Sequence, residues 1–258
     1  MKSNRLTPIF LTSLIMVLLT AACGAVAPEP TATPTEPPPT AVPSATPRPT
    51  ATPRPTATPN IAATQQYENI FAIVQAAFDS GQLPSTKGRM VALEDFSYEW
   101  AQIGYYDFFD TGQDVTDFVI RAHFKWQSAI ANPELSGCGF VFRIEDDWDH
   151  YLIYLDSTRI RVAIYNASGG NVAYGIGTSG GDGRADYGNP AEADFAMVAN
   201  GGKVYVYLEG QYKAEFSVFS DRFTFPSGHL AYTIKSGTNK DYGTRCEMTN
   251  VTLWHVTP

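Results

Sequence analysis

The chain has 258 residues and a formal net charge of −8 at pH 7, and 13% of its residues are aromatic. From Asn60 onward, 14 Lys and Arg stand against 24 Asp and Glu. A domain this acidic is a poor partner for a nucleic acid, so we expect no nucleic-acid partner. The roughly 200 residues of this part are enough for a single β-sandwich with a substantial core.

The first 22 residues have the features of an export signal. A positively charged start precedes the apolar run Ile9–Leu19, which is too short to span a bilayer, and small residues lead to Cys23. This leader resembles the bacterial lipobox, although Thr20 stands where leucine is commoner. The resemblance implies removal of residues 1–22 and lipidation of Cys23, with the protein anchored to the membrane on its extracytoplasmic side. A plain secretory signal, which would release the protein, is the alternative.

The segment that follows, 23–59, is predicted to be a disordered but stiff stalk. Residues 28–59 contain 12 prolines and 9 threonines, and the sequence PRPTAT occurs twice in tandem. Dense proline favours extended polyproline II at about 3.1 Å per residue, which gives this stalk a reach of roughly 100 Å. We therefore expect it to carry a folded domain away from the bilayer.

Residues 60–88 are predicted to form one amphipathic helix and a connector. Between residues 62 and 80 the apolar positions recur at helical spacing, and Gly81 supplies a stop. The apolar positions are Tyr67, Ile70, Phe71, Val74 and Phe78. The helix is either a collar packed on the base of the domain or a surface for oligomerisation or for a partner.

Residues 89–258 are predicted to fold as an all-β domain. Nine short segments are rich in β-branched and aromatic residues, with Gly, Asn, Asp or Pro between most of them. They are Asp117–Trp126, Gly139–Ile144, His150–Tyr154, Arg159–Tyr165, Phe195–Ala199, Lys203–Leu208, Gln211–Phe216, Gly228–Ile234 and Cys246–Val256. Glu209-Gly210 indicates a tight hairpin turn, and the glycine-rich run Gly175–Gly183 a flexible loop. This number and spacing of strands favours a two-sheet sandwich.

Two cysteines lie in the folded part, Cys138 and Cys246. Outside the cytoplasm such a pair is most simply interpreted as a disulfide, which would close a long loop and stabilise the fold by roughly 3 to 5 kcal/mol. Two buried free thiols are the alternative.

Several strands together resemble the concanavalin A-like lectin/glucanase superfamily, which includes laminin G-like modules. The likeness rests on GCGFVFR at 137–143, the aromatic strand HYLIYLD at 150–156, the hairpin KVYVYLEG at 203–210 and the closing strand 246–254. The resemblance covers roughly residues 90 to 257 and implies a two-sheet antiparallel jelly-roll sandwich. It leaves the activity open, because the superfamily contains enzymes, lectins and protein-binding modules.

Catalytic and metal-binding patterns are weak in this sequence. The superfamily's retaining glucanases carry a Glu-x-Asp-x-x-Glu motif, and the nearest match, Glu145 to His150, ends in histidine. The four histidines are widely separated and lack the spacing of a metal site. We therefore assign no catalytic residue, no metal ligand and no cofactor. Calcium stays open, because the carboxylates around Asp147 suit a hard cation.

An aromatic and polar set is the remaining candidate for function. Arg143, Asp147, Trp148 and Tyr151 are the predicted ligand-binding residues, because flat rings stack on sugar C–H faces while charged groups bind the hydroxyls. Packing of these rings in the core is the competing interpretation. The leading hypothesis is a surface-displayed, non-catalytic module that binds glycans, polysaccharide or a cell-wall component. The alternatives are a glycoside hydrolase-like enzyme and a structural or adhesion module.

Overall fold

The computed structural model of the chain describes residues 61–257 except 131–134, 146–147, 168 and 170–171. The leader, Cys23, the stalk and Asp147 lie outside the described residues, and the predictions made for them stay predictions. Among the described residues, no helix has both the length and the apolar character that crossing a bilayer would take.

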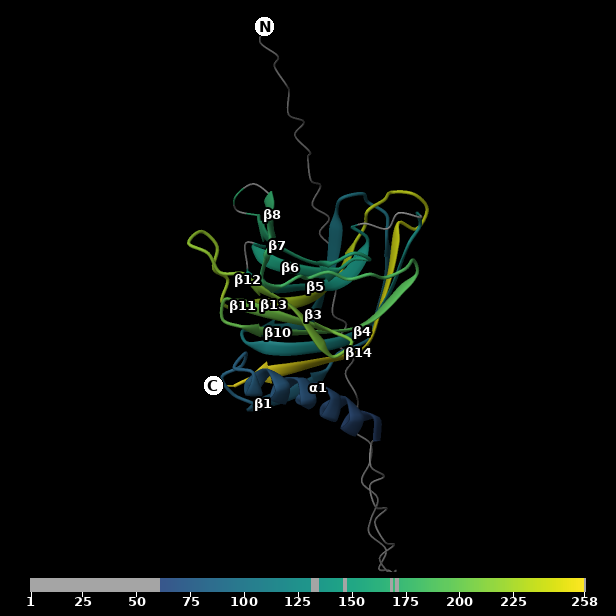
Figure 1. The fold of residues 1–258 in the computed structure, drawn as a ribbon. Coiled ribbons are helices and arrows are strands. Elements are labelled where there is room, and N and C mark those ends of the chain that lie inside the picture. Colours follow the sequence, from purple (N-terminus) through teal and green to yellow (C-terminus); the bar gives the residue numbers. More distant parts are fainter. Residues whose placement is uncertain (1–60, 131–134, 146–147, 168, 170–171, 258) are drawn as a thin grey trace, which may run out of the picture. The chain divides into compact units, whose positions relative to one another are not determined.

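Fourteen strands follow one helix in the described part of the chain, and they form two antiparallel sheets (Figure 1). The helix α1 is Ile61–Asp79. The strands are β1 (Gly88–Ala92), β2 (Phe96–Trp100), β3 (Tyr106–Val115), β4 (Phe118–Ser128), β5 (Gly137–Ile144), β6 (His150–Leu155), β7 (Ile160–Asn166), β8 (Val172–Ile176), β9 (Thr178–Gly181), β10 (Ala191–Asn200), β11 (Lys203–Leu208), β12 (Gln211–Ser217), β13 (Gly228–Lys235) and β14 (Thr244–Val256).

The larger sheet has the order β1-β14-β4-β10-β11-β12-β9, with β2 also paired to β14, and the smaller one has the order β3-β13-β5-β6-β7-β8. The predicted two-sheet antiparallel jelly-roll sandwich is therefore confirmed. All nine predicted strands are present. The predicted loop over Gly175–Gly183 is wrong, because this segment supplies parts of β8 and β9, which pair with β7 and β12.

The turn between β11 and β12 shows how local sequence fixes register. Glu209 and Gly210 both have positive φ, 52° and 72°, as a two-residue type I′ hairpin turn requires. Leu208 and Gln211 are therefore partners across the turn, and the predicted hairpin is confirmed.

The core lies between the two sheets, where alternate residues of each strand meet. Phe124 and Phe195 of the larger sheet stack on each other, with ring centres 4.8 Å apart. The Phe124 ring centre also lies 5.8 Å from that of Phe140. Phe140 and Phe142 of β5 face them from the smaller sheet and are fully buried. This interior gives the sandwich its main hydrophobic stabilisation.

Helix α1 covers the face of the larger sheet that points away from the core (Figure 1). Ile70, Val74 and Ala77 are fully buried against Val119 and Trp254. The ring of Phe71 lies 5.6 Å from the ring of Trp254. The collar interpretation of the helix is thus confirmed for these residues, and Val74 is not free to contact a partner.

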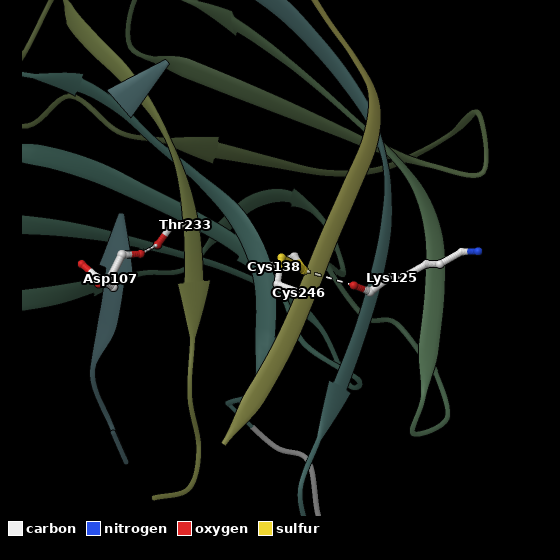
Figure 2. The surroundings of a disulfide bond; sticks show 5 residues. All are labelled: Asp107, Lys125, Cys138, Thr233 and Cys246. Atoms are coloured by element: carbon white, nitrogen blue, oxygen red, sulfur yellow. Dashed lines mark hydrogen bonds between the residues drawn. A yellow bond between two sulfur atoms is a disulfide. The ribbon is translucent and has the colours of Figure 1, made fainter. Parts of the chain in front are cut away.

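The predicted disulfide joins Cys138 of β5 to Cys246 of β14, and so links the two sheets (Figure 2). Both cysteines are fully buried. The sulfur of Cys138 also lies 3.5 Å from the main-chain oxygen of Lys125 in β4. At the neighbouring edge of the smaller sheet, the Thr233 hydroxyl donates to the main-chain oxygen of Asp107 at 2.7 Å.

Arg143 departs from the strand alternation that the sequence predicts. The register between β13 and β5 shifts at this point, so that His229 pairs with Ile144 and Leu230 with Phe142. Arg143 has no partner in β13 and a φ of 55°, which identifies a β-bulge. The bulge turns Arg143 inward, where its side chain is fully buried.

The Arg143 guanidinium donates hydrogen bonds to three of the loops that connect strands. It donates to the main-chain oxygens of Thr116 at 2.7 Å, Gly201 at 2.7 Å and Phe225 at 3.5 Å. Asp117 lies 3.4 Å away and accepts a further bond. Burial lowers the pKa of Arg143, and the Asp117 carboxylate acts in the opposite direction. The prediction that Arg143 is a ligand-binding residue does not fit this burial, because every contact named here is structural.

Replacing Arg143 with methionine should destabilise the fold by about 3 to 5 kcal/mol, because the carbonyls and the Asp117 carboxylate would lose a buried charged partner. Chemical denaturation followed by circular dichroism measures this. Arg159→Met, at an exposed position, is the matched control and should change the free energy of unfolding by less than about 0.5 kcal/mol. Equal stability of the two variants would show that the Arg143 bonds contribute little.

Candidate functional site

The face of the smaller sheet that points away from the core carries a second apolar cluster. Val141, Leu152 and Ala231 lie there, at most 4% exposed. They are covered by Tyr106 and Phe108, two partly buried aromatic residues of β3. Aromatic rings therefore line part of this face, where a solvated sheet usually carries charged side chains.

His150, at the start of β6, fixes the position of these rings. Its Nδ1 lies 2.6 Å from the main-chain oxygen of Trp148, and its Nε2 lies 2.7 Å from the hydroxyl of Tyr106. The imidazole also stacks on Tyr165 of β7, with ring centres 5.0 Å apart. Three separate segments, β3, β7 and the loop before β6, thus meet at one buried side chain.

The bonding pattern sets the protonation state of His150. A main-chain oxygen only accepts, so Nδ1 carries the hydrogen, and the neutral ring then accepts the Tyr106 hydroxyl proton at Nε2. Burial lowers the pKa of His150 to about 4, although the Trp148 oxygen and Asp149 act against that shift. Burial also raises the pKa of the Tyr106 hydroxyl, which keeps its proton for this bond.

Trp148 lies on the short loop between β5 and β6 and is 59% exposed. Its φ of 69° is unusual for a large side chain. The main-chain nitrogen of Trp148 donates to Glu145 at 2.9 Å, and its oxygen is held by His150. The Trp148 ring leans on Phe108, with 5.5 Å between ring centres. An exposed aromatic ring is thus held in a strained turn by specific bonds.

Two clefts lie beside this ring. The larger has a volume of about 650 Å³ and the smaller about 240 Å³. The larger cleft is lined by Tyr105, Tyr106, Phe108, Trp148, His150, Tyr165 and Ala167. The smaller cleft is lined by Phe108, Asp110, Ile144, Glu145, Trp148 and His229. Phe108 and Trp148 belong to both.

Among the described lining residues of the two clefts, the carboxylates belong to the smaller cleft, where Asp110 and Glu145 both contribute. Asp110 accepts a bond from the main-chain nitrogen of Gly112 at 2.9 Å. His229 is paired with Asp114 at 2.6 Å.

Within the described part of the chain, no group of three or more His, Cys, Asp or Glu side chains is placed to hold a metal ion. Calcium at the loop that contains Asp147 stays a prediction, because Asp147 is not described.

Another cleft, of about 420 Å³, lies between α1 and the larger sheet. Of its charged side chains, Arg121 and Asp194 are paired with each other at 3.6 Å, and Glu209 accepts a bond from the main-chain nitrogen of Asp194 at 3.1 Å. The Tyr207 hydroxyl in its lining donates to Gln82. We place the candidate site at the Trp148 clefts because they combine an exposed ring with polar groups.

The four predicted ligand-binding residues do not form one set. Trp148 is at the site, Asp147 is outside the described residues, and Arg143 and Tyr151 are fully buried. The Tyr151 hydroxyl accepts a bond from the main-chain nitrogen of Phe225 at 3.0 Å, and its ring packs on Phe142 in the core. The competing core interpretation therefore holds for Tyr151.

Sequence reasoning missed the contribution of β3, which supplies Tyr106 and Phe108. The signal was present as the aromatic run Tyr105-Tyr106-Asp107-Phe108-Phe109. Alternation within it places Tyr106 and Phe108 on one face of the strand and Phe109 on the other, as the structure shows.

Comparison with known proteins gives only distant likenesses. No protein-family model matches the chain, and no curated protein matches it. Among solved structures, the carbohydrate-binding module CBM66 from Bacillus subtilis is 14% identical, with a TM-score of 0.43, over 64% of this chain and 94% of that one.

The apo Crh5 transglycosylase is 10% identical with a TM-score of 0.43, over 63% of this chain and 72% of that one. The Caenorhabditis elegans galectin LEC-6 is 13% identical with a TM-score of 0.35, over 64% of this chain and 96% of that one. At these identities and scores, the comparison assigns neither a ligand nor an activity to this chain.

Proposed function

We propose that the domain is a non-catalytic binding module for glycans, displayed outside the cell membrane, and that its ligand binds at the Trp148 clefts. The observation that carries this proposal is the exposed Trp148 ring, held in a turn with positive φ by the buried His150. Strain of this kind persists only where surrounding contacts maintain it, and such turns gather at ligand sites.

The chemistry of the clefts suits a sugar. Pyranose rings present apolar C–H faces that stack on aromatic side chains, and hydroxyls at their edges that need hydrogen-bonding partners. Trp148 and the 61%-exposed Tyr105 offer rings, whereas Asp110 and Glu145 offer acceptors for hydroxyl groups.

A second candidate function is glycoside hydrolysis, and one observation favours it. Asp110 and Glu145 line the same small cleft, and glycosidases use a pair of carboxylates on either side of the scissile bond. Incubating each bound glycan with the chain separates the two functions. Shortened products that disappear in Asp110→Asn and Glu145→Gln would establish the enzyme, and intact glycan would leave the binding module.

The predicted leader and stalk complete the proposal. A lipid on Cys23 would tie the chain to the membrane, and the stalk would present the clefts to a polysaccharide or a cell-wall component. Metabolic labelling with a fatty acid tests the anchor, because label should be incorporated by the native chain and not by Cys23→Ser.

Trp148→Ala should lower the affinity for a bound glycan at least about tenfold, because burying an indole ring on a ligand contributes 1.5 kcal/mol or more. A glycan array followed by calorimetry measures this. Trp148→Gly, which retains the positive-φ turn without strain, should lose as much affinity. Tyr212→Ala removes a 43%-exposed ring from the larger sheet and should bind like the native chain. Native affinity in Trp148→Ala would contradict the proposed site.

His150→Phe should weaken glycan binding as well. Phenylalanine keeps an aromatic ring at this position but loses the hydrogen bonds to Trp148 and Tyr106. The folded pKa of about 4 lies below the ordinary value of 6.5, so the unfolded chain takes up the proton first. The stability that the neutral His150 contributes to the fold is therefore fully present above about pH 6.5 and is lost as the pH falls to about 4. Denaturation at several pH values should therefore show a shallower acid loss in His150→Phe.

His123→Phe is the control, because His123 lies among Asp194 and Glu192 on the larger sheet. It should bind glycan as the native chain does. Equal binding by His150→Phe and the native chain would show that Trp148 needs no support from His150.

A further inference from the structure

The two clefts share Phe108 and Trp148, whose ring centres are 5.5 Å apart. A ligand that occupies both clefts must cross this pair of rings. We propose that the clefts form one extended site for an uncharged oligosaccharide of at least two sugar units, with one unit in each cleft. This inference rests on the proposed function and adds the class and minimum length of the ligand.

The larger cleft has the chemistry of a stacking site. Its described lining consists of aromatic rings, the buried His150 and Ala167, and none of these carries a charge at neutral pH. Lys235 is the cation near it, with its amino group 5.8 Å from the centre of the Tyr106 ring and bonded to the main-chain oxygen of Gly104. Lys235 is not among the described lining residues, so a carboxylate-bearing sugar would meet no cationic side chain in that lining.

The smaller cleft disfavours an anion directly. Asp110 and Glu145 are acceptors for hydroxyl groups and would repel the carboxylate of a uronic acid. The imidazole of His229 is already paired with the Asp114 carboxylate at 2.6 Å. The acidic balance of the domain acts in the same direction at longer range.

Each cleft also has exposed residues of its own, which makes the two separable by mutation. Tyr105 lines only the larger cleft and is 61% exposed. His229 lines only the smaller cleft, and its side chain is 52% exposed. Because both positions are exposed, their replacement by alanine should leave the sandwich folded, and circular dichroism checks this.

The experiment measures the affinity of the full-length chain, in a detergent without a sugar headgroup, for size series of oligosaccharides. The neutral series are β-1,4-linked glucose, β-1,3-linked glucose and β-1,4-linked xylose, from one to six units, and the charged series is galacturonic acid oligomers of the same lengths. We expect a neutral series to gain at least about tenfold in affinity beyond one unit, because a second cleft is then occupied. Galacturonic acid oligomers should bind at least about tenfold more weakly.

The variants show which cleft each unit occupies. His229→Ala should weaken binding of the longer neutral chains at least about fivefold and leave that of the single unit unchanged, whereas Tyr105→Ala should weaken both. Binding that is independent of length, equal effects of His229→Ala on short and long chains, or tighter binding of the charged series would each overturn the extended neutral site. Absence of binding in all four series would instead remove the proposed function, and this inference with it.

Discussion

The buried Arg143 guanidinium is the interaction on which the arrangement of the sandwich most depends. It projects from a bulge in β5 and bonds to main-chain oxygens at Thr116, Gly201 and Phe225, which belong to three different connections. A buried cation is tolerated only when its donors are satisfied, so these connections must lie close to it. The disulfide between β5 and β14 adds a covalent link between the same two sheets.

The bulge in β5 also determines which residue lines the smaller cleft of the candidate site. Because one residue is taken out of register, Ile144 rather than Arg143 pairs with His229 and lines the smaller cleft. The chain then enters the short loop that carries Trp148, and His150 closes it by bonding the Trp148 oxygen. The bulge thus places Arg143 in the core and Ile144 in the lining of a cleft beside Trp148.

Sequence patterns predicted the central strands and missed the outer ones for a physical reason. The missed strands β1, β3, β8 and β9 are the four sheet edges, and β2 lies off the main path of the larger sheet. Edge strands bury less of their surface and so carry a weaker alternation of apolar and polar residues. Among the central strands, β5 and β6 are buried along their whole length, and β7 and β11 alternate between buried and half-buried residues. These strands have the β-branched and aromatic runs from which they were predicted.

The candidate site was predictable only in part. Trp148 was identified as a flat ring beside carboxylates that could stack on a sugar, and the structure places it at the surface. Tyr151 shares a face with Phe142 across β5 and β6, and alternation alone does not say which of two faces is the core. Arg143 was misplaced because a one-residue bulge reverses the alternation from which its direction was inferred. The pairing of Tyr106 with His150 joins residues 44 apart in the chain, and no local pattern indicates it.

The central claim, that ligand binds at Trp148, is tested most directly by the indole N–H resonances of the four tryptophans in a nitrogen-15 spectrum. The indole nitrogens of Trp100, Trp126 and Trp254 are buried in the described fold, whereas Trp148 is 59% exposed. Titration with a bound glycan should shift the Trp148 resonance and leave the other three in place. Saturable binding that leaves the Trp148 resonance unmoved, or that shifts Trp254 beneath helix α1 instead, would contradict the account.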